Sequence, residues 1–329
     1  MGREHPGASE GFGVIPQTEV RLRTMFVFKK EQQAFDFGGV TVGGQPGQNP
    51  TVLIGGLFFT TQPIVKSAKE GTFDKEMTKQ WIDTAKMMVE KTGHPLIIQA
   101  FGRTPEAMEN HLSWLGENFD GPFMFESTSG DARKKAIEYC HETGLSKRAI
   151  YNSINLSMKD DEKQLLRNSS LKMAVVLGWS PKAMSLPDRM ETIRSMIDEA
   201  KAIGIEKMVV DPATMPVGAG YGLEYRTVLA IKSELGLPTC LGPHNAPSAW
   251  KFIKQAGFDD EITQTSAIVA STVAAQLFAT DCIMYGSMAR TKQVFTATAL
   301  IANAMAAAIA EAQQALGLSH PIFEPPSFE

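Results

Sequence analysis

The sequence predicts a (β/α)8 barrel, the TIM-barrel fold, preceded by a β-hairpin. From residue 51 onward, eight short runs of strand-forming residues alternate with longer amphipathic segments, which is typical of a parallel sheet covered by helices. The alternating unit also has the length typical of such barrels, about 250 residues or more. The competing fold, a doubly wound open sheet, would need a GxGxxG phosphate loop after its first strand. The segment IGGLFFTTQP does not match that motif.

The hairpin is predicted from residues 26–44, FVFKKEQQAFDFGGVTVGG. Two short alternating patterns flank a Gly-Gly turn there, and we expect the hairpin to cap the barrel floor. Residues 1–24 are rich in Gly, Pro and charge and lack the apolar centre of a signal peptide. We therefore expect a flexible extension at 1–24 and one domain at 25–329.

The strands and helices of the barrel follow in order. The predicted strands are residues 51–59, 95–101, 122–126, 148–152, 172–179, 207–212, 238–243 and 281–286. Helical patterns lie between them, several closed by Gly, among them 74–93, 104–119, 130–144, 186–204 and 224–236. The Ala- and Met-rich residues 295–316 predict a long helix that packs on the barrel or forms the face of a homodimer. The Pro-rich residues 319–329 predict an extended tail.

Composition excludes several classes of protein. The net charge of -4, without a dense Lys/Arg stripe, argues against a nucleic-acid partner. No run approaches the roughly 18 apolar residues of a membrane span, so direct membrane insertion is not expected. Cys140, Cys240 and Cys282 have no CxxC spacing, which indicates neither a disulfide framework nor a zinc knuckle and fits a reducing cytoplasm.

Polar side chains gather where the predicted strands end. They are Gln99 on the second strand, Glu126 with Ser127 on the third, Asn152 on the fourth, Asp211 on the sixth, and His244 with Asn245 after the seventh. The strand ends of a barrel form its reactive face. Burying such groups unpaired costs roughly 1–3 kcal/mol each. They therefore pair with each other and with helix N-termini, or they bind a polar ligand such as a heterocycle. Polar groups at so many strand ends favour the second interpretation.

Other chemistries have weaker support. No predicted strand ends on Lys, which argues against a Schiff-base aldolase, and no GxSxG motif or Ser/His/Asp set has a convincing placement between a predicted strand and helix. Cys240 and His244 are four residues apart and could share a zinc ion. Because no second cysteine lies in a matching loop, we expect no metal site, and a metal-dependent lyase stays an alternative.

Four blocks together carry a resemblance to a known family: GGVTVGGQPGQNPTVLIGGLFF, RAIYNSINL, VVDPATMPVG and HNAPSAW. From about residue 25 to the C-terminus the chain resembles the H subunit of tetrahydromethanopterin S-methyltransferase. Relatives of that family move methyl groups between methylated corrinoid proteins and tetrahydrofolate or tetrahydromethanopterin. More distantly, the chain is similar to methyltetrahydrofolate:corrinoid methyltransferases and dihydropteroate synthases, which are barrels that bind a pterin at the strand tops.

The resemblance implies a role for each strand-end residue. Asp211 would anchor the pyrimidine half of a pterin, and Asn245 would reach the methyl-carrying nitrogen. Asn152 and Ser127 with Glu126 would complete the floor of the site, and Gln99 lies where the second strand contributes. Relatives usually carry Asp at positions 99 and 126. This chain has therefore lost one charge and lengthened one side chain.

The implied reaction is a direct displacement between the pterin nitrogen and a cobalt-bound methyl group. Glu126 is the candidate general acid/base, with a helix-capping acid as the structural alternative. No DxHxxG motif is present, so the corrinoid is expected on a separate partner protein. The resemblance also favours a homodimer. Two other functions stay open: the pterin-handling subunit of a membrane-bound complex, and a non-catalytic pterin- or corrinoid-protein-docking module.

Overall fold

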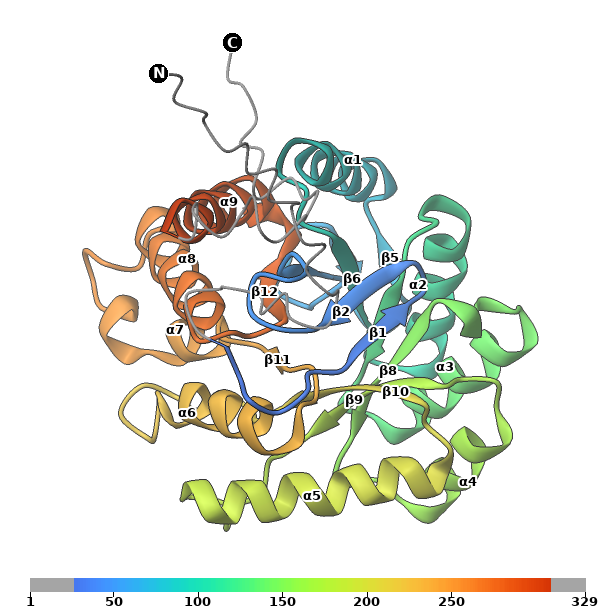
Figure 1. Cartoon of the computed structure of the whole chain (residues 1–329). Helices are drawn as coiled ribbons and strands as arrows, with labels where there is room; N and C mark the ends of the chain where they lie inside the picture. Colours follow the sequence, from blue (N-terminus) through green and yellow to red (C-terminus); the bar gives the residue numbers. More distant parts are fainter. Residues whose placement is uncertain (1–26, 309–329) are drawn as a thin grey trace, which may run out of the picture.

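Eight parallel strands form a closed barrel in this computed structural model, which describes residues 27–308 (Figure 1). The strands are β3 (Val52–Leu57), β6 (Leu96–Phe101), β7 (Phe123–Glu126), β8 (Ala149–Ile154), β9 (Met173–Leu177), β10 (Lys207–Asp211), β11 (Cys240–Leu241) and β12 (Cys282–Ser287). The sheet order is β10-β9-β8-β7-β6-β3-β12-β11. It closes because Val210 donates its backbone N–H to Pro238 at 2.9 Å and forms a parallel bridge with Thr239. The barrel prediction is confirmed, and the open sheet is wrong.

The predicted hairpin is also present and covers one end of the barrel. Strands β1 (Ala34–Phe37) and β2 (Val40–Gly43) pair in antiparallel fashion, and Gly38 and Gly39 make the turn with φ of 62° and 95°. Phe37 is 1% exposed and packs against the residues that begin the barrel strands, such as Val52 and Met173. The hairpin is therefore the floor of the barrel, and Figure 1 shows it in blue across that end.

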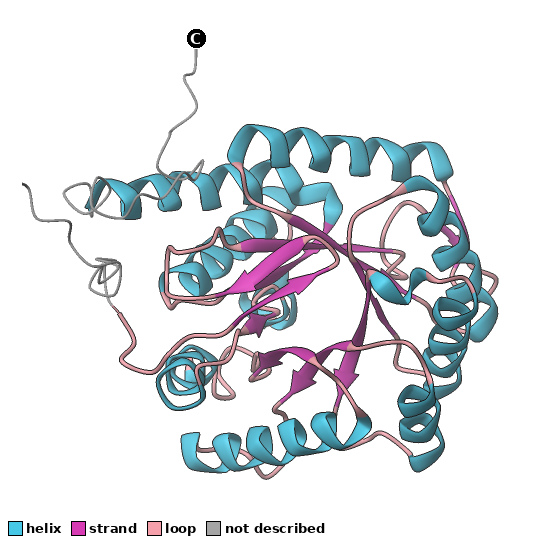
Figure 2. Cartoon of the chain, turned by 45° about the vertical axis from the view of Figure 1, so that its right-hand side comes forward, coloured by secondary structure: helices cyan, strands magenta, loops and turns pink. Residues whose placement is uncertain are grey.

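Helices surround the barrel (Figure 2). They are α1 (Lys75–Thr92), α2 (Pro105–Asn118), α3 (Gly130–Glu142), α4 (Asp160–Asn168), α5 (Leu186–Ile203), α6 (Leu223–Ala230), α7 (Asn245–Ala249), α8 (Glu261–Leu277) and α9 (Thr291–Ala308). Local chemistry sets many of their ends: Ser185 caps the start of α5, and Gly93 and Gly204 end α1 and α5 in the left-handed region.

The loop after β3 contains a second hairpin that the sequence patterns did not predict. It consists of β4 (Val65–Ser67) and β5 (Thr72–Phe73). Phe73 packs on Phe58 and His111, with ring centroids 4.6 and 5.5 Å apart. This hairpin therefore packs between the end of β3 and α2.

The long helix predicted for residues 295–316 is described as α9, which ends at Ala308 in the described part of the chain. It packs against α1 and α8, as expected for a barrel helix. Leu300 on α9 is 68% exposed, so that one face of the helix is uncovered in the single chain. The predicted extension at 1–24 and the tail at 319–329 lie outside the described residues. Within residues 27–308, no helix is both long and apolar enough to span a membrane.

The inside of the barrel changes from apolar to polar along its axis. Successive inward-facing side chains of a strand are two residues apart. In four strands an apolar residue is followed by a polar one: Ile97 then Gln99, Met124 then Glu126, Ile150 then Asn152, and Val209 then Asp211. The apolar members pack with the hairpin floor, and the polar members form the layer at the strand tops.

Candidate active site

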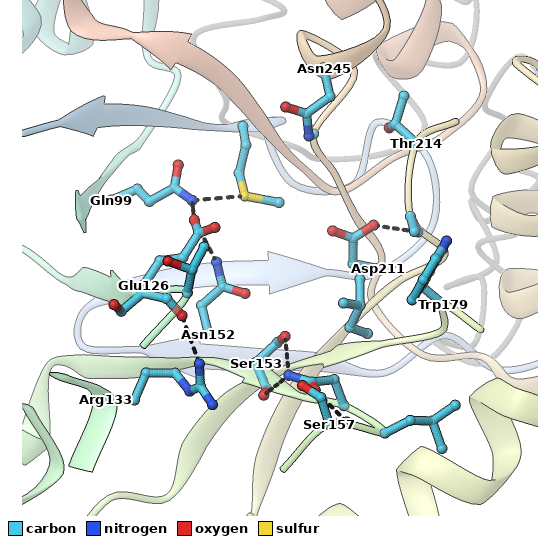
Figure 3. Close-up of a pocket in the computed structure, with 18 of the residues that line it drawn as sticks. Gln99, Glu126, Arg133, Asn152, Ser153, Ser157, Trp179, Asp211, Thr214 and Asn245 are labelled. Atoms are coloured by element: carbon cyan, nitrogen blue, oxygen red, sulfur yellow. Dashed lines mark hydrogen bonds between the residues drawn. The ribbon is translucent and has the colours of Figure 1, made fainter. Parts of the chain in front are cut away.

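A cavity of about 620 Å³ opens at the strand tops (Figure 3). Its lining includes all of the site residues predicted from the sequence: Gln99, Glu126, Ser127, Asn152, Asp211 and Asn245. His244 lines it as well. The barrel thus brings together side chains from five different strand ends or loops.

Gln99, Glu126 and Asn152 form one cluster on neighbouring strands. The Gln99 amide donates a hydrogen bond to the Glu126 carboxylate, and Asn152 Nδ2 donates to the same oxygen at 3.4 Å. Gln99 lies two residues before the end of its strand, because β6 continues to Phe101 as the predicted strand 95–101 does. Burial raises the pKa of Glu126, whereas the Gln99 amide and the charge of Arg133 lower it. Glu126 can therefore hold a proton at a higher pH than an exposed glutamate does.

Glu126 does not cap the following helix. Ser129 is the N-cap of α3, and its hydroxyl accepts the Ala132 N–H at 3.4 Å. The Ser127 hydroxyl accepts the Ser129 N–H at 3.0 Å. The interpretation of Glu126 as a helix-capping acid is therefore wrong, and its carboxylate lines the cavity instead.

Asp211 stands on the side of the cavity that faces this cluster (Figure 3). Its side chain is buried, and Oδ1 accepts the Ala213 N–H at 2.8 Å. Burial raises the pKa of Asp211 to about 7, with a further contribution from the charge of Glu126. Arg189 holds the loop after β10, because its Nη1 donates to the carbonyls of Pro212 and Ala213 at 2.9 and 3.0 Å. The carboxylate is thus fixed in place by the backbone.

Asn245 and His244 follow β11 at the start of α7. His244 Nδ1 lies 2.8 Å from the Met284 carbonyl, and burial lowers the pKa of the imidazole. Nδ1 therefore donates its hydrogen to that carbonyl, and the ring is neutral. The Asn245 side chain lines the cavity and has no hydrogen bond to any other residue between 27 and 308. Its amide is therefore free to donate to, or accept from, a bound molecule.

The alternative of a Cys240–His244 metal centre has no support from the geometry. Cys240 is paired in register with Cys282, which is itself in register with Val52 at the floor end of the barrel, whereas His244 lines the cavity at the top. Among the described residues, no group of three or more His, Cys, Asp and Glu side chains could hold a metal ion.

A buried ion pair beside Ser127 was not predicted from the sequence. Arg133 on α3 makes two contacts with Glu162 on α4, at 2.6 and 2.9 Å, and donates to the Ser127 carbonyl at 2.7 Å. The half-exposed indole of Trp179 forms part of the rim. Arg133 lies in the charged stretch GDARKK, which is typical of a solvated helix start, so the sequence contained no local signal for its burial.

Comparisons with known proteins show the family to which this part of the chain is similar. The family model described as "Tetrahydromethanopterin S-methyltransferase MtrH subunit" matches residues 30–319. A Methanothermobacter marburgensis protein, named as the H subunit of tetrahydromethanopterin S-methyltransferase, is 37% identical over 284 residues, 84% of this chain and 92% of the relative. The protein of that name from Methanopyrus kandleri is 33% identical over 316 residues, 91% of this chain and 97% of the relative.

Solved structures extend the likeness in fold. Dihydropteroate synthase from Vibrio fischeri ES114 aligns with a TM-score of 0.56 and 12% identity, covering 85% of this chain and 98% of that protein. At this level of identity the likeness concerns the barrel alone, and the site must be argued from its own residues.

Proposed function

Because the chain belongs to the MtrH family of tetrahydromethanopterin S-methyltransferase subunits, we propose that it is a methyltransferase that binds a tetrahydropterin in the strand-top cavity. The methyl group passes between the pterin and a corrinoid carried by a separate protein. The observation that carries this proposal is the lining of the cavity, where a fixed carboxylate faces a cluster of two amides and a second carboxylate above an apolar floor.

That lining suits the edges of a pterin. The amino group and the adjacent ring N–H of a pterin are neighbouring donors, and a carboxylate accepts both. Asp211 is assigned to this edge because its backbone contact fixes its orientation. Asn152, Ser127 and Gln99 supply the donors and acceptors for the rest of the ring. The apolar floor accommodates the faces of a flat heterocycle.

The transfer is a direct displacement. In one direction the C–N bond to the pterin breaks with its electron pair staying on nitrogen, while an electron pair of Co(I) in the corrinoid substrate forms the new Co–C bond; the nitrogen then takes up a proton. Asn245 is assigned to the reacting nitrogen, because an amide can donate or accept as that nitrogen changes its protonation. Glu126 is assigned the role of general acid/base that exchanges a proton with this nitrogen, since burial raises its pKa. Most of the rate enhancement then comes from the alignment of the methyl group with the two reacting atoms and from fixed hydrogen bonds.

The partner brings the corrinoid over the strand tops, where the cavity opens. A corrinoid protein is the partner proposed for this face because the resemblance to the family implies it. The homodimer, the cytoplasmic location and the single domain at 25–329 stay predictions from the sequence.

A rate measurement tests the function. The protein is mixed with a methylated corrinoid protein and with tetrahydrofolate or tetrahydromethanopterin, and the cobalt spectrum is followed. We expect demethylation of the corrinoid that depends on one of the two pterins and on the protein. Pterin binding without methyl transfer to either carrier would contradict catalysis and favour the docking module.

A second candidate is the same half-reaction within a larger complex, because the curated relatives are named as one subunit of a methyltransferase. Purification of the protein from its native cells distinguishes the two. Recovery with integral membrane proteins supports the complex, and recovery with a corrinoid protein alone supports the separate enzyme.

A further inference from the structure

Arg133 occupies a junction in the wall of the active site. It lies in the first turn of α3, is 8% exposed, and lines both the main cavity and a side cavity of about 360 Å³. Its Nη1 donates to the carbonyl of Ser127, the residue that follows Glu126, and Figure 3 shows this contact. Its Nε and Nη2 donate to Glu162.

The network extends to a fourth element. Glu162 is 2% exposed and also accepts the hydroxyl of Tyr151 on β8 at 2.7 Å. The ion pair thus joins β7, β8, α3 and α4 directly behind the strand end that carries Glu126. Burying two charges costs several kcal/mol per ion before their attraction is counted, and an apolar pair of similar size often stabilises as well. Stability alone is therefore a weak reason for a charged pair at this position.

We propose that Arg133 is a positioning residue for Glu126, which it serves by holding the strand end at Ser127 and keeping a fixed positive charge beside the carboxylate. This inference rests on the proposed function, which assigns the proton transfer to Glu126. It adds a residue that acts on the proton transfer through Glu126.

Among the groups that surround Glu126, Arg133 is the one whose positive charge affects its pKa. The side chains from β6 and β8, Gln99 and Asn152, are neutral amides. Asp211 faces Glu126 from β10 with a negative charge when ionised, and Glu162 on α4 lies behind Arg133. The positive charge of Arg133 lowers the pKa of Glu126. Without it, Glu126 keeps its proton to a higher pH.

The test uses a matched pair of variants. Arg133→Met alone would leave Glu162 buried without its partner, and Glu162→Gln alone leaves the charge of Arg133 with only an amide oxygen in place of the carboxylate. The folded state of each variant is therefore checked by urea unfolding before the titration. The double variant Arg133→Met/Glu162→Gln removes both charges and keeps an acceptor for Tyr151. Its control is Glu162→Gln alone, which retains the arginine and its bond to Ser127. The comparison between these two proteins isolates the contribution of Arg133, its charge together with its bond to Ser127.

The first readout is the titration of Glu126 by ¹³C NMR of side-chain carboxyl groups, with the signal assigned from its loss in Glu126→Gln. We expect the midpoint in the double variant to lie about one pH unit above that in Glu162→Gln. The midpoint in Glu162→Gln should be equal to or below that of the wild type, because a negative charge has been removed. Equal midpoints in the double variant and its control would overturn the inference.

The second readout is the pH dependence of methyl transfer. The limb assigned to Glu126 should move with the NMR midpoint, whereas a purely structural role would lower the rate at every pH without moving it. Arg133→Lys, with Glu162 intact, should restore the wild-type position of the limb. If the wild type shows no methyl transfer at all, the proposed function fails, and the NMR titration still decides the coupling between Arg133 and Glu126.

Discussion

Gln99 and Glu126, on neighbouring strands of the barrel, share a hydrogen bond in which the amide donates to the carboxylate. Asn152 donates to the same oxygen from the strand on the other side. The carboxylate is therefore held between two neutral donors at the top layer of the barrel. Because both donors are amides, Glu126 does not share a proton with a second carboxyl group at these positions.

Gln99→Glu should undo this arrangement. Two carboxyl groups in hydrogen-bond contact do not both ionise readily, so one proton is shared and the higher of the two apparent pKa values rises. We expect the limb of the pH–rate profile assigned to Glu126 to move upward by about one unit or more. The profile of methyl transfer between roughly pH 5 and 9 measures it, and an unchanged limb would contradict the role of Glu126 as the proton carrier.

The affinity for tetrahydropterin should rise with pH. Burial raises the pKa of Asp211 to about 7, and only the ionised carboxylate accepts both donors of the pterin edge. Half of the free protein is in the binding form at that pH, so the Kd at pH 6 should be about tenfold weaker than at pH 8. Calorimetric titration at both pH values measures the ratio. An affinity that does not change over this range would show that Asp211 does not anchor the pterin.

Asp211→Asn should stabilise the free protein. A folded-state pKa of about 7, above the ordinary aspartate value of 3.8, means that ionisation of Asp211 opposes folding. This cost is absent at low pH, grows as the pH rises above the unfolded value, and is complete above pH 7. The variant should therefore gain on the order of 2–4 kcal/mol in the free energy of unfolding at pH 8, and less at pH 5. Urea unfolding at the two pH values measures the difference, and a less stable variant would contradict the assigned burial cost.

Asn245→Ala should lower the rate of transfer more than the affinity for pterin. The side-chain amide has no partner among residues 27–308, so its removal leaves no protein group unpaired. Loss of one fixed hydrogen bond to the reacting nitrogen corresponds to a decrease of roughly 10²-fold in kcat. Single-turnover kinetics at saturating pterin measure it. Unchanged turnover would remove Asn245 from the reaction.

Phe37→Ala should destabilise the barrel without affecting the site. Phe37 is 1% exposed and packs at the floor, the end of the barrel away from the cavity. We expect a loss of about 3–5 kcal/mol in the free energy of unfolding and an unchanged Kd for pterin. Phe252→Ala, at a residue that is 43% exposed, is the matched control and should change little. A large change in pterin affinity for Phe37→Ala would show that floor and site are coupled.

The barrel could be predicted because alternation and turn chemistry are local properties. Short apolar runs, such as the one that ends at Glu126, stand between helices with clear ends. The polar layer followed from the same reasoning, since the strand tops of a barrel meet at one end. The small hairpin β4–β5 was missed because its strands are three and two residues long, too short to show an alternating pattern.

The partners of each site residue could not be predicted. The bond between Gln99 and Glu126 spans 27 positions, and that between Arg133 and Glu162 spans 29. Both depend on the register of neighbouring strands and on how two helices start beside them. Arg133 and Glu162 lie in charge-rich helical segments, where charges are usually solvated. Only the packed structure shows that this pair is buried.

The most direct test of the central claim is a calorimetric titration of the wild type and of Asp211→Asn with tetrahydromethanopterin and tetrahydrofolate at pH 8. We predict that the wild type binds at least one of the two pterins with one site per chain. The variant, for which we predict a gain in stability, should bind that pterin about 100-fold more weakly, since a bidentate charge-assisted contact is replaced by a neutral one. Equal affinity in the two proteins, or no binding of either pterin by the wild type, would contradict a pterin site at the strand tops.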